Sequence, residues 1–220
     1  MSGSRRAVSF PSMDRSRLEA FSDGVFAVAI TLLALNLTVA GPGHGPLLKQ
    51  LHWAAFAGYL ISFLTIGIIW VNHHALVRSI KQVDRTLLFV NQILLIFVVM
   101  IPFGTATMSD YLPRNSPDAR LAMVLYAGIF LGMSAGFSAI FEWTLHGDHV
   151  YQPLPAEQHW PARRRFVGGA LVYVVAIVIA VFNALAAFVL ISLVAVYYIF
   201  ERTPTSPAAP DTPDDSPLVG

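Results

Sequence analysis

Long apolar runs separated by short polar segments dominate the chain. A membrane-spanning helix needs about 20 mostly apolar residues. Five runs reach that length, and the fifth is much longer: Leu18–Ala40, His52–Val77, Thr86–Met108, Ala119–Trp143 and Phe166–Phe200. A Gly- and Pro-rich segment follows the first run, and the polar stretch His146–Arg165 precedes the last. Because Gly and Pro interrupt helices, the pattern predicts an all-α membrane protein with short connections between its spans.

The fifth run, Phe166–Phe200, is too long for one span. At 1.5 Å per residue a single helix of this length would be roughly 50 Å long, whereas the hydrocarbon core is about 30 Å thick. Two helices joined by a tight turn near Phe182-Asn183 fit better, since Asn is a tolerated turn residue. We therefore predict six transmembrane helices.

The distribution of basic residues predicts the orientation of these helices. If the N-terminus is cytoplasmic, eleven of the Lys and Arg residues lie on the inside and three on the outside. The inside set is Arg5, Arg6, Arg15, Arg17, Arg78, Lys81, Arg85, Arg163, Arg164, Arg165 and Arg202, and the outside set is Lys49, Arg114 and Arg120. This bias follows the positive-inside rule and predicts that both termini are cytoplasmic.

Composition narrows the functional classes. The chain has 220 residues, of which 55% are apolar and only 12% are charged, against about 25% charged in a typical soluble domain. It has no cysteine, which excludes disulfides, thiolate metal sites and Cys nucleophiles. We expect a cytoplasmic N-terminal tail over residues 1–16, a membrane domain over 17–200, and a Pro-rich, disordered cytoplasmic tail over 201–220.

The first predicted helix carries ionisable residues where lipid disfavours them. Arg17 lies at the cytoplasmic end and can extend to the interface, whereas Asp23 lies deeper. The two are roughly 240° apart around the helix, so each needs partners on other helices. Candidates at similar depth are Trp70, His73, His74 and Asn91. A structural polar network is favoured over direct contact with a transported ion.

Further along the same helix, Val28, Thr31, Leu32 and Leu35 recur at the spacing of one helical stripe. Any membrane helix produces such a stripe by chance, so periodicity alone indicates ordinary packing. A second observation is needed to give the stripe a function.

That second observation is a resemblance. The string Arg17-x-x-x-Phe21-Ser22-Asp23 at the start of the first helix resembles the signature of the transmembrane protein 175 family, the lysosomal-type potassium channels and their bacterial relatives. Trp70-x-x-His73-His74 is similar to the pattern in the second helix of that family. Asn91, followed by an apolar run that ends Ile101-Pro102-Phe103, also matches. The resemblance spans residues 17–200.

The resemblance implies a potassium channel of the bacterial six-helix branch, a homotetramer whose first helices line a central pore. It implies that the constriction is hydrophobic and maps to Val28, where the family usually has Ile or Leu. Thr31, Leu32 and Leu35 map to further pore positions. Arg17, Phe21, Ser22, Asp23, Trp70, His73 and Asn91 map to the network that braces the pore helix. The family has no Thr-Val-Gly-Tyr-Gly filter, and none occurs here. Bacterial members look less selective for potassium than animal ones.

Other classes of protein fit less well. A proton-coupled secondary transporter that titrates Asp23 is the main alternative, but transporters often show inverted repeats and helices broken at mid-depth. An enzyme is not expected, because no nucleophile–base set occurs. We expect no cofactor and no bound metal, with K⁺ as the permeant ion. The expected partners are other copies of the chain and lipid of the cell membrane, and no nucleic acid.

Overall fold

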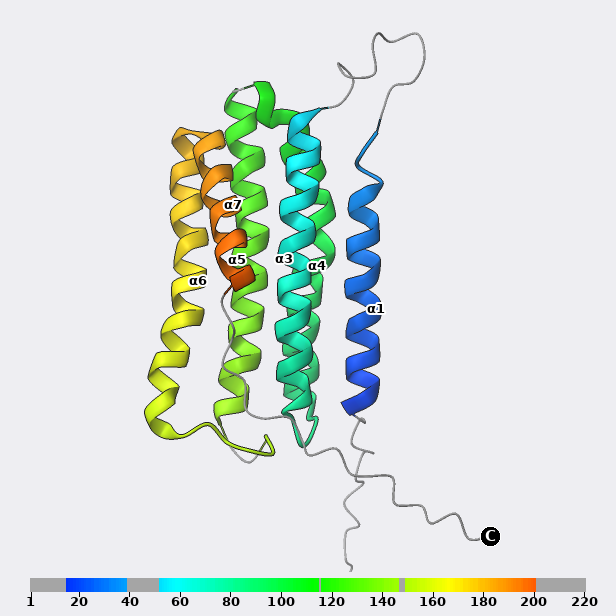
Figure 1. The fold of residues 1–220 in the computed structure, drawn as a ribbon, viewed down its shortest axis with the longest axis vertical. Helices are drawn as coiled ribbons and strands as arrows, with labels where there is room; N and C mark the ends of the chain where they lie inside the picture. The colour runs from blue at the N-terminus through cyan, green and yellow to red at the C-terminus, as the bar shows by residue number, and fades with distance from the viewer. Residues whose placement is uncertain (1–14, 39–51, 115, 147–148, 201–220) are drawn as a thin grey trace, which may run out of the picture.

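The computed structural model describes residues 15–38, 52–114, 116–146 and 149–200. The described part is a helical bundle (Figure 1) with one isolated bridge between Ile80 and Val150. In chain order its elements are α1 (Arg15–Ala34), α3 (Trp53–Arg78), α4 (Arg85–Tyr111), the 3-10 turn η1 (Leu112–Arg114), α5 (Pro117–Leu145), α6 (Ala156–Phe182) and α7 (Ala184–Phe200). The six α-helices in these ranges confirm the predicted number.

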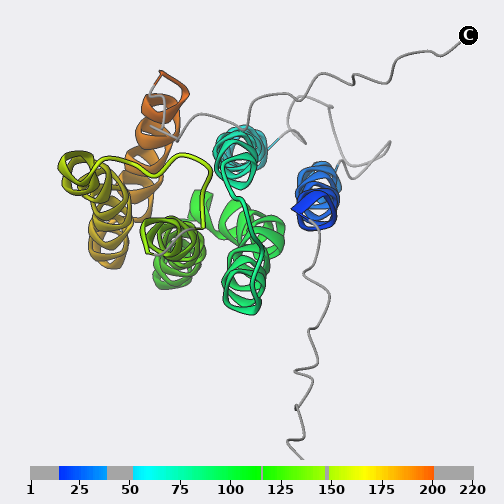
Figure 2. The same ribbon diagram turned by 90° about the horizontal axis from the view of Figure 1, so that it is seen from below.

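Successive helices run up and down along one direction, as Figure 1 shows. The lower end of the bundle in that view holds the start of α1 and the α3–α4 and α5–α6 connections. Four helical segments in the described ranges are long and apolar enough to cross a membrane. They are Trp53–Arg78, Arg85–Arg114, Pro117–Leu145 and Ala156–Phe182. Helix α1 and the shorter α7 lie alongside these spans and complete the bundle (Figure 2).

The second, third and fourth predicted helices agree with α3, α4 and α5 to within three residues at each end. Their starts follow local capping chemistry. Asp84 caps α4, its carboxylate accepting a hydrogen bond of 2.7 Å from the backbone N–H of Leu87. Ser116 caps α5 in the same way, and Pro117 occupies the first turn, where its missing N–H costs nothing.

The turn in the fifth apolar run lies at Asn183, as predicted. Asn183 adopts an extended backbone, with φ −149° and ψ 105°, between the end of α6 and the start of α7. Its side-chain oxygen accepts a hydrogen bond of 3.0 Å from the N–H of Ala186. The residue therefore ends one helix and satisfies a donor of the next without any Gly or Pro.

Two predicted helices have wrong boundaries. The first helix begins earlier and ends at Ala34 rather than Ala40, because Asn36 leaves the helix and donates to the backbone oxygen of Pro102. Residues 39–40 lie outside the described ranges. Helix α6 begins at Ala156, ten residues before the predicted Phe166, and contains Pro161. The polar stretch is helical there because Ala, Glu, Gln and Arg are good helix formers and contact with α5 supports them.

Close packing of α4 on α5 depends on two glycines. A Cβ at Gly136 would lie 2.9 Å from the backbone Cα of Leu94, and one at Gly132 would overlap the ring of Phe97. A Cβ at Gly128, one turn further from this contact, meets nothing within 4 Å. Gly132 and Gly136 therefore serve helix contact, as small residues often do between membrane helices. Of the predicted N-terminal tail, residues 1–16, residues 1–14 lie outside the described residues and Arg15 and Ser16 belong to α1. The predicted C-terminal tail, residues 201–220, also lies outside them.

Candidate functional site

Helix α1 lies at one edge of the subunit, where it packs against α3 and α4 (Figure 2). One face is buried against those helices and consists of Leu18, Ser22, Phe26, Ala29 and Leu33. The predicted stripe of Val28, Thr31, Leu32 and Leu35 is exposed, and its centre lies roughly 130° around the helix from the buried face. The other helices of the subunit therefore cover one side of α1 and leave the stripe uncovered.

A buried chain of hydrogen bonds joins α1, α4 and α3. The amide nitrogen of Asn91 donates to the hydroxyl oxygen of Ser22 at 3.0 Å. The side-chain oxygen of Asn91 pairs with Nε2 of His73 at 2.7 Å. All three side chains are almost completely buried, and Asn91 is 1% exposed. Since His73 Nε2 must donate to the amide oxygen, the neutral ring carries its proton on Nε2. The ring also lies 5.4 Å from that of Phe26.

A second set of contacts lies beside this chain, between α1 and α3. The indole N–H of Trp70 donates to Oδ1 of Asp23 at 2.8 Å. One turn toward the start of α1, the carboxylate of Glu19 lies 2.9 Å from Nδ1 of His74. His73 and His74 thus have different partners, because adjacent residues on a helix point about 100° apart.

Arg17 and Phe21 are placed differently from the rest of the predicted network. Within the described ranges, Arg17 does not join the hydrogen bonds of Ser22, Asn91 and Asp23. It is exposed and, with Phe21, lines an open cavity between α1 and α4 that also includes Arg85 and Phe89. The structure brings together five of the seven predicted residues, Ser22, Asp23, Trp70, His73 and Asn91, in two neighbouring groups.

The exposed stripe is apolar except for one hydroxyl. Val28 is 55% exposed and Leu35 is 71% exposed, with Thr31 and Leu32 between them along the helix. The Thr31 hydroxyl donates to the backbone oxygen of Val28 at 2.8 Å. Its donor is therefore used within the helix, while the oxygen keeps acceptor capacity on the uncovered side.

Two further contacts fix the ends of α1. At the lower end, the guanidinium of Arg15 donates to the backbone oxygen of Arg78 at 3.1 Å. At the upper end, the Asn36 amide donates to the oxygen of Pro102 at 3.0 Å. The sequence did not predict the roles of Arg15 and Asn36, since each donates to a backbone carbonyl and no side-chain pattern indicates such a contact.

Similarity to known proteins supports the resemblance found in the sequence. A family model described as the endosomal/lysosomal potassium channel TMEM175 matches residues 17–102. A Streptomyces collinus protein named as a potassium channel is 36% identical over 195 residues, which are 87% of this chain and 94% of that protein. The chain belongs to the TMEM175 family. The residues matched by the family model include α1 from Arg17 onward and every residue of the two polar groups described above.

Other TMEM175 relatives extend the match to three dimensions. A crystal structure described as a lysosomal potassium-selective channel TMEM175 homolog from Chamaesiphon minutus has a TM-score of 0.72 and 31% identity, covering 84% of this chain and 96% of that one. The mouse protein named as the endosomal/lysosomal proton channel TMEM175 is 30% identical over 158 residues, which are 64% of this chain but only 30% of the mouse protein. Family and apolar helices together make this chain a multi-pass membrane protein.

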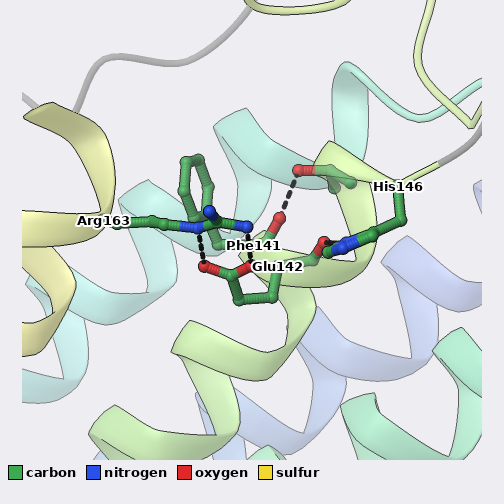
Figure 3. Close-up of polar contacts among 5 residues, drawn as sticks. Phe141, Glu142, His146 and Arg163 are labelled. Atoms are coloured by element: carbon green, nitrogen blue, oxygen red, sulfur yellow. Dashed lines mark hydrogen bonds and ion pairs between the residues drawn. The ribbon is translucent and has the colours of Figure 1, made fainter. Parts of the chain in front are cut away.

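One ion pair in this TMEM175 member was not anticipated from the sequence. At the lower end of the bundle, Arg163 of α6 faces Glu142 of α5 (Figure 3), with hydrogen bonds of 2.6 and 2.7 Å to the two carboxylate oxygens. His146 lies beside it and contacts the backbone oxygen of Glu142 at 2.7 Å. The pair attaches the polar first turns of α6 to α5. Its members are 21 residues apart in sequence, so no local spacing pointed to it.

Proposed function

We propose that this chain is a potassium-permeable channel whose pore is lined by the first helix of each subunit. The observation that carries the proposal is the division of α1 into a face buried by its own chain and an uncovered, largely apolar stripe. The choice of potassium as the permeant ion rests on the Streptomyces and Chamaesiphon relatives, which are named as potassium channels. They favour a channel over a proton-coupled transporter.

Val28 is the constriction in this proposal, with Thr31, Leu32 and Leu35 lining the pore beyond it. A ring of Val side chains can control permeation by excluding water from a narrow passage. The hydroxyl oxygens of Thr31 supply acceptors that replace part of the hydration of the ion. Because Val is smaller than the Ile or Leu usual at this position, we expect weaker discrimination of K⁺ from Na⁺.

The proposed assembly is a homotetramer, since a pore on a symmetry axis needs several copies of a helix at the subunit edge. Ser22, Asp23, Trp70, His73 and Asn91 hold that helix from behind, and their distances support a structural role. Arg17 and Phe21 stand beside this network. We place the protein in the cell membrane with both termini cytoplasmic, because the described lower end carries most of the basic residues.

Single-channel recording in a planar bilayer tests this function. We expect unitary K⁺ currents from the wild type, and a changed conductance or K⁺/Na⁺ permeability ratio in Val28→Ala and Val28→Asn. The matched control is Val178→Ala, because Val178 is also 55% exposed and belongs to α6, which lies at the opposite edge of the bundle from α1 (Figure 2). Saturable proton-coupled flux without unitary currents would refute the channel. Equal permeation in the Val28 and Val178 variants would remove Val28 from the pore.

A further inference from the structure

Three side chains with metal-binding groups meet at the lower part of the contact between α1 and α3. They are Glu19 and Asp23 of α1 and His74 of α3. Each offers one ligand atom, and these atoms all lie within 4.8 Å of one another. Glu19 and Asp23 are four residues apart, so their carboxylates lie on the same side of α1. His74 completes the group from the neighbouring helix.

The contact between His74 and Glu19 lacks the geometry of a hydrogen bond. Nδ1 of His74 lies 2.9 Å from Oε1 of Glu19. The nitrogen atom is buried, yet within the described part of the chain it has no hydrogen-bond partner. In the Nε2–H tautomer of His74, the lone pair on Nδ1 faces the carboxylate oxygen, and the two repel each other at this distance. A cation bound by both atoms removes the repulsion and uses both lone pairs.

The surroundings of the three side chains suit a bound cation. The indole N–H of Trp70 donates to Oδ1 of Asp23 and orients that carboxylate, as partners of metal ligands usually do. Arg17, two residues before Glu19, points roughly 200° away around α1 and lines the cavity toward α4. The side chains of Glu19 and His74 are 22% and 37% exposed, which leaves room for water as a further ligand.

We propose that Glu19, Asp23 and His74 bind a divalent transition-metal ion of the Zn²⁺ class. One imidazole nitrogen and two carboxylate oxygens form a ligand set that suits Zn²⁺, with water in a remaining position. Mg²⁺ and Ca²⁺ prefer sets made of oxygen alone, so the imidazole disfavours them. The bound ion links α1 to α3. The sequence predicted no bound metal, because His74 is 55 residues from Glu19 and no local spacing connects the two.

Binding is measured by isothermal titration of the purified full-length protein with ZnCl₂, with MgCl₂ and CaCl₂ as comparators. We expect one saturable Zn²⁺ site per chain and no comparable Mg²⁺ or Ca²⁺ site. His74→Gln and Glu19→Gln should each weaken that site by more than about tenfold, since even partners of ligands are worth that much. His146→Gln is the matched control, because Nδ1 of His146 contacts the backbone oxygen of Glu142 within its own helix end (Figure 3).

Footprinting of the wild type with diethyl pyrocarbonate gives a second measurement that needs no variant. Zn²⁺ should slow the modification of His74 and leave that of His146 unchanged. The proposal is refuted if the wild type binds no Zn²⁺, if the binding survives in His74→Gln or Glu19→Gln, or if Zn²⁺ protects both histidines equally. These readouts measure binding and not current, so they remain informative if the protein proves not to conduct K⁺.

Discussion

Replacing Asn91 with Leu should weaken the attachment of α1 to the rest of its subunit. Leu has the branching and the number of side-chain heavy atoms of Asn but a larger volume, so the packing change itself should cost an amount near the lower end of the range typical of overpacking, about 1–3 kcal/mol. It removes two hydrogen bonds, one to Ser22 at 3.0 Å and one to His73 at 2.7 Å. Hydrogen bonds between membrane helices average about 0.6 kcal/mol and reach about 1.7 kcal/mol. We therefore expect a loss of about 1–3 kcal/mol in the free energy of unfolding.

The size of the loss follows from the position of Asn91 between its two partners. Asn91→Leu leaves the Ser22 hydroxyl and the His73 ring buried without their hydrogen bonds to Asn91, whereas Ser22→Ala removes only one hydrogen bond. Ser22→Ala should consequently cost less than Asn91→Leu. In the double variant the two costs should not add, because the Ser22 bond is lost only once. A coupling energy of about 0.6–1.7 kcal/mol is expected.

The assay is unfolding of the purified oligomer in mixed detergent micelles, followed by tryptophan fluorescence. Gln92→Leu is the control, since Gln92 is the exposed neighbour of Asn91 on the same helix and carries a similar amide. Gln92→Leu should leave stability almost unchanged. If Asn91→Leu is as stable as Gln92→Leu, the buried chain of hydrogen bonds does not hold α1, and the bracing role fails.

Two further substitutions test other contacts. Gly136→Ala should destabilise the protein by about 1–3 kcal/mol, because its Cβ would press on the backbone of Leu94. Gly128→Ala, where the Cβ meets open space, should be neutral or slightly stabilising in the same unfolding assay; equal effects would contradict the packing argument. Trp70→Phe should cost about 1 kcal/mol through the lost bond to Asp23, and the cost should shrink when Asp23→Ala is already present. An undiminished cost would show that the indole acts by packing alone.

The fold was largely predictable because the bilayer fixes helix length. Apolar runs of about 20 residues determine the spans, and the excessive length of Phe166–Phe200 required the turn that Asn183 makes. The start of α6 could not be predicted in this way. Hydropathy indicates where a helix enters the lipid. The helix can nevertheless extend beyond the lipid when its polar residues are good helix formers and contact another helix. Here Arg163 of α6 donates hydrogen bonds to Glu142 of α5.

Five of the seven predicted members of the polar network come together, but their pairings could not be predicted. Depth in the membrane placed Trp70, His73 and Asn91 near the charged start of α1. Which histidine bonds to Asn91 depends on the rotation of α3 about its own axis, because His73 and His74 point about 100° apart. A single sequence contains no measure of that rotation. The partnership of Glu19 with His74 was missed for the same reason.

The polar contacts of α1 have a physical reason if this helix lines a pore. A helix inside a bundle is held by side chains on all sides, whereas a pore helix has water on one side and must be fixed from behind. Polar contacts occur at three levels of α1: Arg15 with Arg78 at the lower end, Ser22 with Asn91 further along, and Asn36 with Pro102 at the upper end. All of them connect α1 to the α3 and α4 segments, on the side away from the stripe. A helix exposed only to lipid would gain little from three such attachments, since lipid solvates its outer face as well as protein does. In the proposed channel, these attachments would keep Val28 and Thr31 at a fixed radius from a shared axis.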